Sequence, residues 1–146
     1  MLVWGHKEGG LVPILLDGER VATVDPSFWG ERARLLIADR EWEFDKLSGD
    51  LVARPAGQKA PVLRARRKGL FSSAWLVEGD GTTYEVSSEG FTGSTHRIMR
   101  DGTRVGTAGR DGFWTPRVTL EVDESVPAMH QLFLMWVSHI IRRRAA

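Results

Sequence analysis

The most constraining feature of this sequence is a nearly continuous apolar segment in its last quarter. Residues 128–141 read AMHQLFLMWVSHII. At the helical period, only Gln131, Ser138 and Arg142 form a polar stripe along this segment, and that stripe is narrow. A helix with so wide an apolar arc is buried on most of its circumference. The rest of the chain is therefore expected to enclose it.

The ends of this helix are marked in the sequence. Asp123 and Ser125 suit a helix start, where acids complement the dipole and a hydroxyl caps a backbone amide, and Pro127 suits the first turn. Arg142–Arg144 suit the opposite end of the dipole. We expect the helix to run from about residue 126 to about residue 142.

A C-terminal tail anchor in a membrane is the alternative to a core helix. The apolar run from Val126 to Ile141 is shorter than the roughly 20 residues that a membrane span requires, and it contains His130 and His139. The prediction is therefore a core helix, and an integral membrane protein is not expected.

The residues before the helix have the features of short antiparallel strands. Trp42 and Phe44 alternate with acids, and residues 118–122 alternate in the same way. In the segment from Leu70 to Glu78, Phe71 and Trp75 are expected to share one face of a strand. Asp-Gly pairs are typical of tight hairpin turns. They occur at Asp17-Gly18, Asp80-Gly81, Asp101-Gly102 and Asp111-Gly112.

Together these patterns predict a mainly β fold in a single domain covering residues 1–146. About twelve short strands between residues 2 and 122 are expected to form a closed antiparallel barrel around the buried C-terminal helix. Closure is favoured because an open sheet exposes unpaired edges. The segment Arg54–Pro61 is rich in proline and small residues and reads as a longer loop between two groups of strands.

Composition excludes several classes of protein. Of 146 residues, 42% are apolar and 27% are charged, as in ordinary globular domains. The net charge of +1 argues against a nucleic-acid-binding protein, which normally carries a large positive excess. No cysteine is present, so thiolate catalysis, thiolate metal ligation and disulfides are excluded. The N-terminus lacks the pattern of a cleaved signal peptide, and a cytoplasmic location is expected.

The order of many short strands followed by one apolar helix resembles the tubby C-terminal-like superfamily. This superfamily includes the LURP-one-related and phospholipid scramblase-like families. The resemblance is carried by Arg104–Arg110, by Phe113-Trp114, by residues 118–122 and by Gln131–Trp136. It implies a twelve-stranded barrel filled by a central helix, and a domain that contacts phospholipid headgroups. The sequence is shorter than typical members, and the basic residues that bind phosphoinositides in tubby proteins do not map onto it.

The residues that could carry catalytic or metal chemistry are expected to have structural roles. The four histidines are scattered, and His130 and His139 lie on opposite sides of the helix, so no metal site is expected. His130 is expected to be a core histidine. Gly93-Ser94-Thr95-His96 places a hydroxyl beside an imidazole, but neighbours along a strand face opposite sides. No cofactor and no enzymatic activity are expected. The carboxylates of Glu41, Glu43 and Asp45 are expected to be solvated.

One basic segment remains as a candidate binding site. Arg64, Arg66, Arg67 and Lys68 form the only dense basic run within the strands, and clustered cations attract anionic lipid. A strand kept soluble by its charges is the alternative. Phe28-Trp29 and Phe113-Trp114 are further contact or packing candidates.

The function predicted from sequence is a non-enzymatic binding or scaffold domain that contacts phospholipid headgroups at a membrane surface. The alternatives are a protein–protein interaction module and a structural domain without a small ligand.

Overall fold

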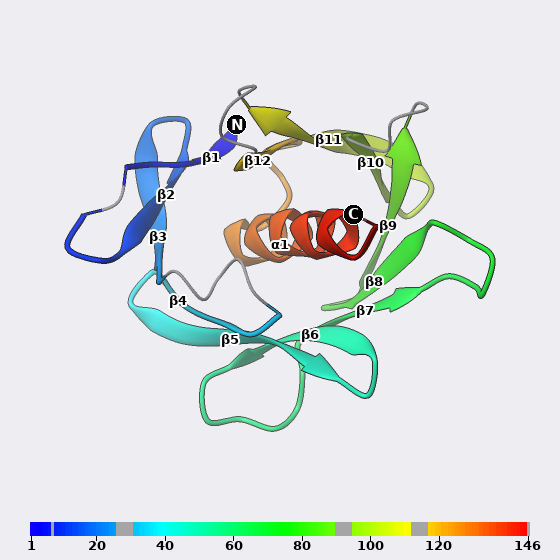
Figure 1. Cartoon of the computed structure of the whole chain (residues 1–146), viewed down its shortest axis with the longest axis horizontal. Coiled ribbons are helices and arrows are strands. Elements are labelled where there is room, and N and C mark those ends of the chain that lie inside the picture. The colour runs from blue at the N-terminus through cyan, green and yellow to red at the C-terminus, as the bar shows by residue number, and fades with distance from the viewer. Residues whose placement is uncertain (7, 26–30, 90–94, 112–116, 146) are drawn as a thin grey trace.

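The computed structural model of the chain describes residues 1–6, 8–25, 31–89, 95–111 and 117–145. Within these residues the chain forms twelve strands followed by the helix α1 (Ala128–Ala145), which lies inside the ring of strands (Figure 1). The strands are β1 (Leu2–Trp4), β2 (Val12–Leu16), β3 (Glu19–Val24), β4 (Ala33–Ile37), β5 (Arg40–Leu47), β6 (Asp50–Pro55), β7 (Leu63–Arg67), β8 (Trp75–Gly79), β9 (Thr82–Glu89), β10 (Thr95–Arg100), β11 (Thr103–Asp111) and β12 (Arg117–Val122).

The strands form a closed antiparallel barrel. Each strand pairs with the next one along the chain, and β1 closes the ring by pairing with β12 through Leu2 and Leu120. The predicted barrel of about twelve strands around a C-terminal helix is therefore confirmed. Because the barrel is closed, each of the strands that the structure describes has a neighbour on both sides, which protects it from pairing with another chain.

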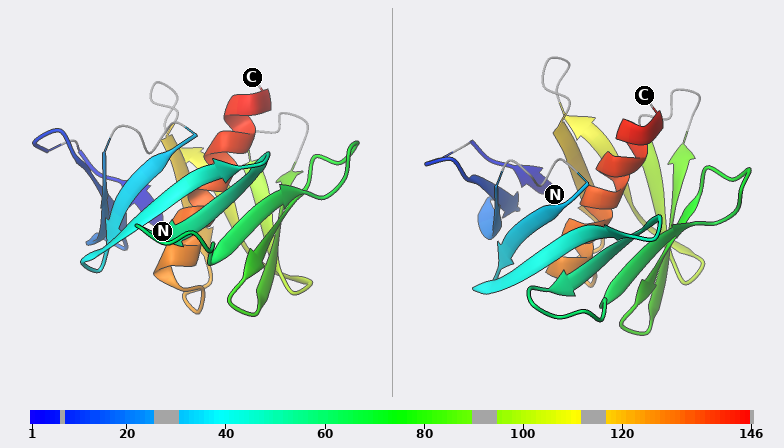
Figure 2. Two further views of the ribbon diagram at one scale, coloured as in Figure 1. Left: turned by 90° about the horizontal axis from the view of Figure 1, so that it is seen from below. Right: turned by 60° about the horizontal axis from the view of Figure 1, so that its bottom comes forward.

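The Asp-Gly pairs form hairpin turns as predicted. Asp80 and Gly81 both have positive φ angles, 50° and 71°, which is the requirement of a type I′ turn. Asp17-Gly18 and Asp101-Gly102 show the same pair of positive φ angles. The fourth pair, Asp111-Gly112, ends outside the described residues. These three turns lie at one end of the barrel, where α1 also begins (Figure 2).

Alternating apolar side chains of the strands point inward and meet α1. Phe44 of β5 is fully buried, and its ring lies 5.2 Å from that of Phe133 and 5.6 Å from that of Trp136, measured between centroids. Such edge-on and tilted ring contacts add to the stabilisation from burial. The strands supply the rest of this wall with side chains that are also fully buried, among them Leu2, Ile14, Leu51, Val77, Val86, Ile98 and Leu120.

The helix α1 is the centre of the core. Its side chains from Leu132 to Val137 are fully buried, so the predicted core helix is confirmed and the tail-anchor alternative is wrong. Among the described residues, no helix has the length and apolar character required to cross a membrane. The helix begins at Ala128, slightly later than expected. Ser125 does not cap it, because it lies three residues before Ala128, in the preceding turn, where its hydroxyl and amide both donate to Asp123 Oδ1.

Two predicted boundaries are wrong. The strand expected from Leu70 begins only at Trp75, because the β7–β8 connection turns back on itself first: the Lys68 amide donates to the Ala74 carbonyl at 2.8 Å. Phe71 therefore lies in a hairpin loop and not on a buried strand face. The loop expected over Arg54–Pro61 is shorter, since Arg54 and Pro55 belong to β6 and pair with β5.

Candidate functional site

The predicted basic segment lies on β7 and at the start of the β7–β8 loop. Arg64 and Arg66 point outward from β7 and form ion pairs at 3.1 Å with Asp50 and Glu78 on the neighbouring strands. Lys68 lies 3.4 Å from a carboxylate oxygen of Glu85. Exposed pairs of this kind contribute little to stability, but each carboxylate reduces the positive charge that the strand presents. The segment is therefore less cationic than its sequence indicates.

Arg67 lies apart from these pairs. It lines a small pocket of about 160 Å³ beside the end of α1, together with Trp75 and Arg144. The Arg144 guanidinium lies over the Trp75 ring, 5.7 Å from its centroid, and its Nε donates to Glu31 at 2.9 Å. Arg67 makes no ion pair with any residue that the structure describes. The structure thus brings one predicted cation next to the basic C-terminal end of the helix.

The tip of the β7–β8 hairpin carries two exposed apolar side chains. Leu70 is 89% exposed and Phe71 is 103% exposed. The loop is held in this form by its own hydrogen bonds, because the Ser72 amide donates to the Gly69 carbonyl and the Ala74 amide donates to the Ser72 hydroxyl. In both views of Figure 2 the hairpin projects beyond the barrel at the end where α1 finishes.

This arrangement places an apolar tip next to cations. Arg67 and Lys68 directly precede the tip in the chain, and Arg144 lies beside Arg67 at the same end of the barrel. Apolar side chains with neighbouring Lys and Arg are typical of segments that enter the interface of an anionic bilayer. Leu70, Phe71 and Arg144 were not predicted as site residues. The sequence signal for this tip was the apolar pair Leu70-Phe71, which follows the basic run and Gly69.

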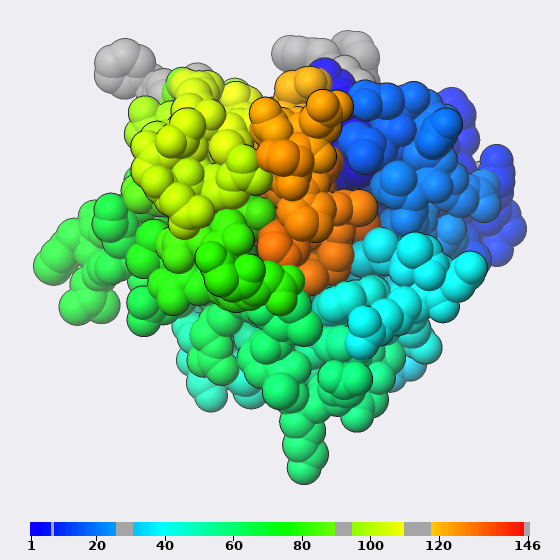
Figure 3. Space-filling model, turned by 180° about the vertical axis from the view of Figure 1, so that it is seen from behind, coloured from blue at the N-terminus to red at the C-terminus, as the bar shows by residue number. Residues whose placement is uncertain are grey.

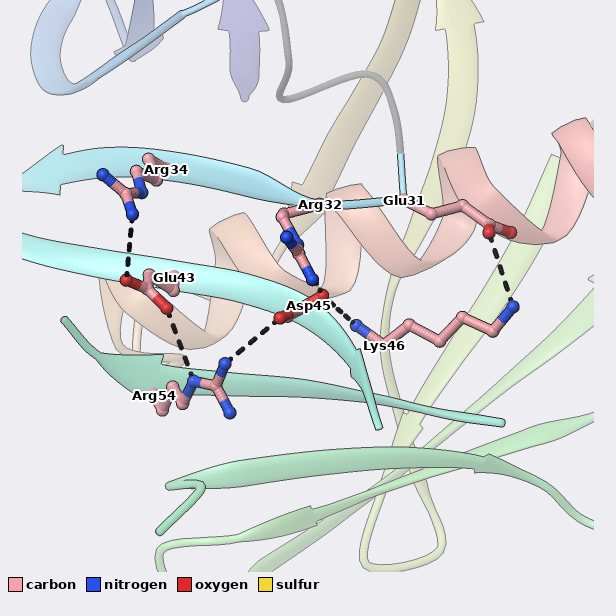
Figure 4. Close-up of polar contacts among 7 residues, drawn as sticks. All are labelled: Glu31, Arg32, Arg34, Glu43, Asp45, Lys46 and Arg54. Atoms are coloured by element: carbon pink, nitrogen blue, oxygen red, sulfur yellow. Dashed lines mark hydrogen bonds and ion pairs between the residues drawn. The ribbon is translucent and has the colours of Figure 1, made fainter. Parts of the chain in front are cut away.

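The prediction that the carboxylates of β5 are solvated is partly wrong. Asp45 is buried, and Figure 4 shows it between Arg32 and Arg54. Arg54 also lies 3.5 Å from Glu43, which is half-buried. The two carboxylates lie on the outer surface of β5, where the arginines cover them, and a buried carboxylate requires such partners. Arg34 of β4 also pairs with Glu43, at 3.8 Å, so these ion pairs link three adjacent strands and we assign the cluster to joining β4, β5 and β6.

The histidines also have structural partners. His96 is buried and shares a hydrogen bond with Ser138 of α1. Ser94, the predicted neighbour of His96, lies outside the described residues. Burial, with a smaller effect of Arg142, lowers the pKa of His96 to about 4, so its ring is neutral at physiological pH. His130 is buried as predicted. Among the described residues, no group of three or more His, Asp or Glu side chains is placed to hold a metal ion.

Comparisons with protein-family models, curated proteins and solved structures give no match to this chain. The class that the structure defines is a closed twelve-stranded antiparallel barrel around a C-terminal helix, with one projecting apolar hairpin. Phe28-Trp29 and Phe113-Trp114, predicted as contact or packing residues, lie outside the described residues.

Proposed function

We propose that this chain is a non-enzymatic binding domain, related to the tubby-like barrels, that docks on anionic phospholipid surfaces through the β7–β8 hairpin. The exposure of Leu70 and Phe71 beside Arg67 and Lys68 is the observation that carries the proposal. The barrel with its central helix supports the tubby-like relationship, which stays a prediction, as does the cytoplasmic location.

The chemistry of the hairpin favours lipid for two reasons. Transfer of exposed Leu and Phe side chains out of water is favourable by about 1.5–3 kcal/mol each when burial is complete. Each cation held close to an anionic surface adds about 1 kcal/mol. Neither contribution is sufficient alone for stable binding, so both the tip and the cations are required.

Vesicle flotation tests this proposal. The full chain is expected to float with vesicles of phosphatidylcholine that contain phosphatidylserine, and to float less as salt is raised. The double variant Leu70→Ser/Phe71→Ser is expected to lose at least about tenfold in partitioning. Arg67→Gln/Lys68→Gln is expected to weaken binding to the anionic vesicles only. Leu36→Ser removes a half-exposed leucine from β4 and serves as the matched control.

Flotation that is equally strong for the double variant, or absent at low salt, would contradict the proposal. The interaction-module alternative predicts a different result from the same exposed pair. In that case the chain would not float, but it would self-associate or capture a protein in a manner that Leu70→Ser/Phe71→Ser abolishes.

A further inference from the structure

A second cleft lies at the other end of the barrel, where α1 begins. It has a volume of about 580 Å³, which is in the range of sites for small organic molecules. Its walls come from the start of β5, the β8–β9 hairpin, the end of β10 and the first turn of α1. Figure 3 shows this end: the start of α1 (orange) lies recessed between the β4–β5 strands (cyan) and the β8–β9 hairpin (green).

A chain of hydrogen bonds forms one wall of the cleft. His130 Nε2 lies 2.8 Å from Asp80 Oδ2, and His130 Nδ1 lies 2.8 Å from the Tyr84 hydroxyl. Because a carboxylate only accepts, Nε2 donates to Asp80, and Nδ1 shares the second hydrogen bond with the Tyr84 hydroxyl. Burial raises the pKa of the Tyr84 phenol, which therefore keeps its proton. The wall is preorganised, and Asp80 remains half-exposed toward the cleft.

Two arginines of the cleft are held without carboxylates. The Arg40 guanidinium lies 5.1 Å from the centroid of the Trp42 ring, and Arg100 Nη2 donates to the Ser125 hydroxyl at 3.0 Å. Neither makes an ion pair with any residue that the structure describes, whereas Arg54 and Arg66 do. An indole ring and a hydroxyl fix the position of a guanidinium without neutralising it by direct contact. The carboxylate that acts on Arg100 from a distance is that of Asp123, whose pKa is lowered by hydrogen bonds from Ser125 and, to a smaller extent, by the charge of Arg100. Both guanidinium groups thus remain able to donate hydrogen bonds to an oxyanion.

We propose that this cleft binds a small organic molecule through a phosphate or carboxylate group held by Arg40 and Arg100. The apolar wall of Val62, Pro127 and Met129 contacts the body of the ligand. The exposed oxygen of Asp80 accepts a hydrogen bond from a hydroxyl or amine of the ligand, which gives the site a preference for a polar donor next to the anion. The proposal is independent of the hairpin, which lies at the opposite end of the barrel.

Amide and arginine side-chain NMR spectra of the full chain test this site. The probes are inorganic phosphate, phenyl phosphate and benzoate, each titrated against sodium chloride of equal ionic strength. We expect saturable shifts of the Trp42 indole N–H and of the Arg40 and Arg100 Nε–H signals. Phenyl phosphate or benzoate is expected to bind more tightly than inorganic phosphate, and the tighter of the two identifies the oxyanion that the cleft prefers.

Matched variants assign the shifts to the cleft. Arg40→Gln and Arg100→Gln are each expected to weaken binding about tenfold or more, since each removes the charge-assisted hydrogen bonds of one guanidinium. Arg34→Gln, an exposed arginine of β4 outside the cleft, is expected to bind unchanged. Shifts that do not saturate, that occur away from the cleft, or that persist in both variants would overturn the proposal. A dispersed spectrum without the probe shows that each variant is folded.

Discussion

The buried polar side chains of α1 have partners in the protein, and the half-buried Arg142 at its end has them too. Gln131 Nε2 donates to the Val126 carbonyl at 2.9 Å, and Ser138 shares a hydrogen bond with His96 of β10. Arg142 directs its guanidinium toward the carbonyls of Ala108 and Gly109 on β11. Buried polar groups with partners specify how a helix sits in its surroundings. The narrow polar stripe thus orients the helix within the barrel.

The buried His96 predicts a loss of stability in acid. Its pKa is about 4 in the folded chain, whereas an unfolded histidine titrates near 6.5. Between these values the unfolded chain binds a proton that the folded chain does not, so the free energy of unfolding falls as the pH falls through this window. Between about pH 7 and about pH 5 the expected loss from His96 is about 2 kcal/mol. Urea denaturation at the two pH values measures it.

Two variants separate this effect from other titrations. His96→Asn retains a polar atom near the position of Nδ1 but does not titrate, so most of the pH dependence is expected to disappear. His6→Gln replaces an exposed histidine and is expected to leave the pH dependence of stability unchanged. An unchanged pH dependence in His96→Asn would show that another group causes the acid sensitivity.

At the scale of the elements, one glycine allows the end of β8 to lie close to the start of β7. Gly79 ends β8 with a φ angle of 150°, and a Cβ atom there would collide with the Val62 carbonyl oxygen and lie 3.0 Å from the Leu63 Cα. Since backbone cannot yield as a side chain can, Gly79→Ala is expected to lower the free energy of unfolding by at least about 2 kcal/mol.

Gly69 offers the matched control for this substitution. It lies in the β7–β8 loop with open space around its Cα and without a positive φ angle. Gly69→Ala is therefore expected to change stability by no more than about 0.5 kcal/mol. Equal effects of the two substitutions in thermal or urea unfolding would contradict the close approach at Gly79.

Most elements could be predicted because their patterns are local. The alternation of Trp42 and Phe44 with acids and the positive φ angles required at Asp80-Gly81 depend on neighbouring residues only. The prediction of a strand from Leu70 was wrong because the apolar residues at the loop tip continue the alternating pattern of the strand that follows them. The hydrogen bonds of the loop, among them the one between Lys68 and Ala74, show where the chain turns.

At the scale of the whole molecule, the candidate sites depend on contacts that the sequence does not contain. The cations of β7 were predicted, but their carboxylate partners lie on other strands, 12 to 17 residues away in the chain. The second cleft joins Arg40 to Arg100 and His130 across the barrel end. The overall fold could be predicted because a helix that is apolar over most of its circumference must be enclosed by the rest of the chain. A closed barrel of strands provides that enclosure.

The central claim is that α1 is the core of the barrel and cannot leave it while the barrel stays folded. Native-state hydrogen exchange of the full chain tests this claim most directly. The account predicts that amides of Leu132–Ile140 exchange only through global unfolding, with the same free energy and urea dependence as the amides of Val52 and Ile98. Exchange of the helix amides through a lower-energy opening, with the strand amides still protected, would contradict it.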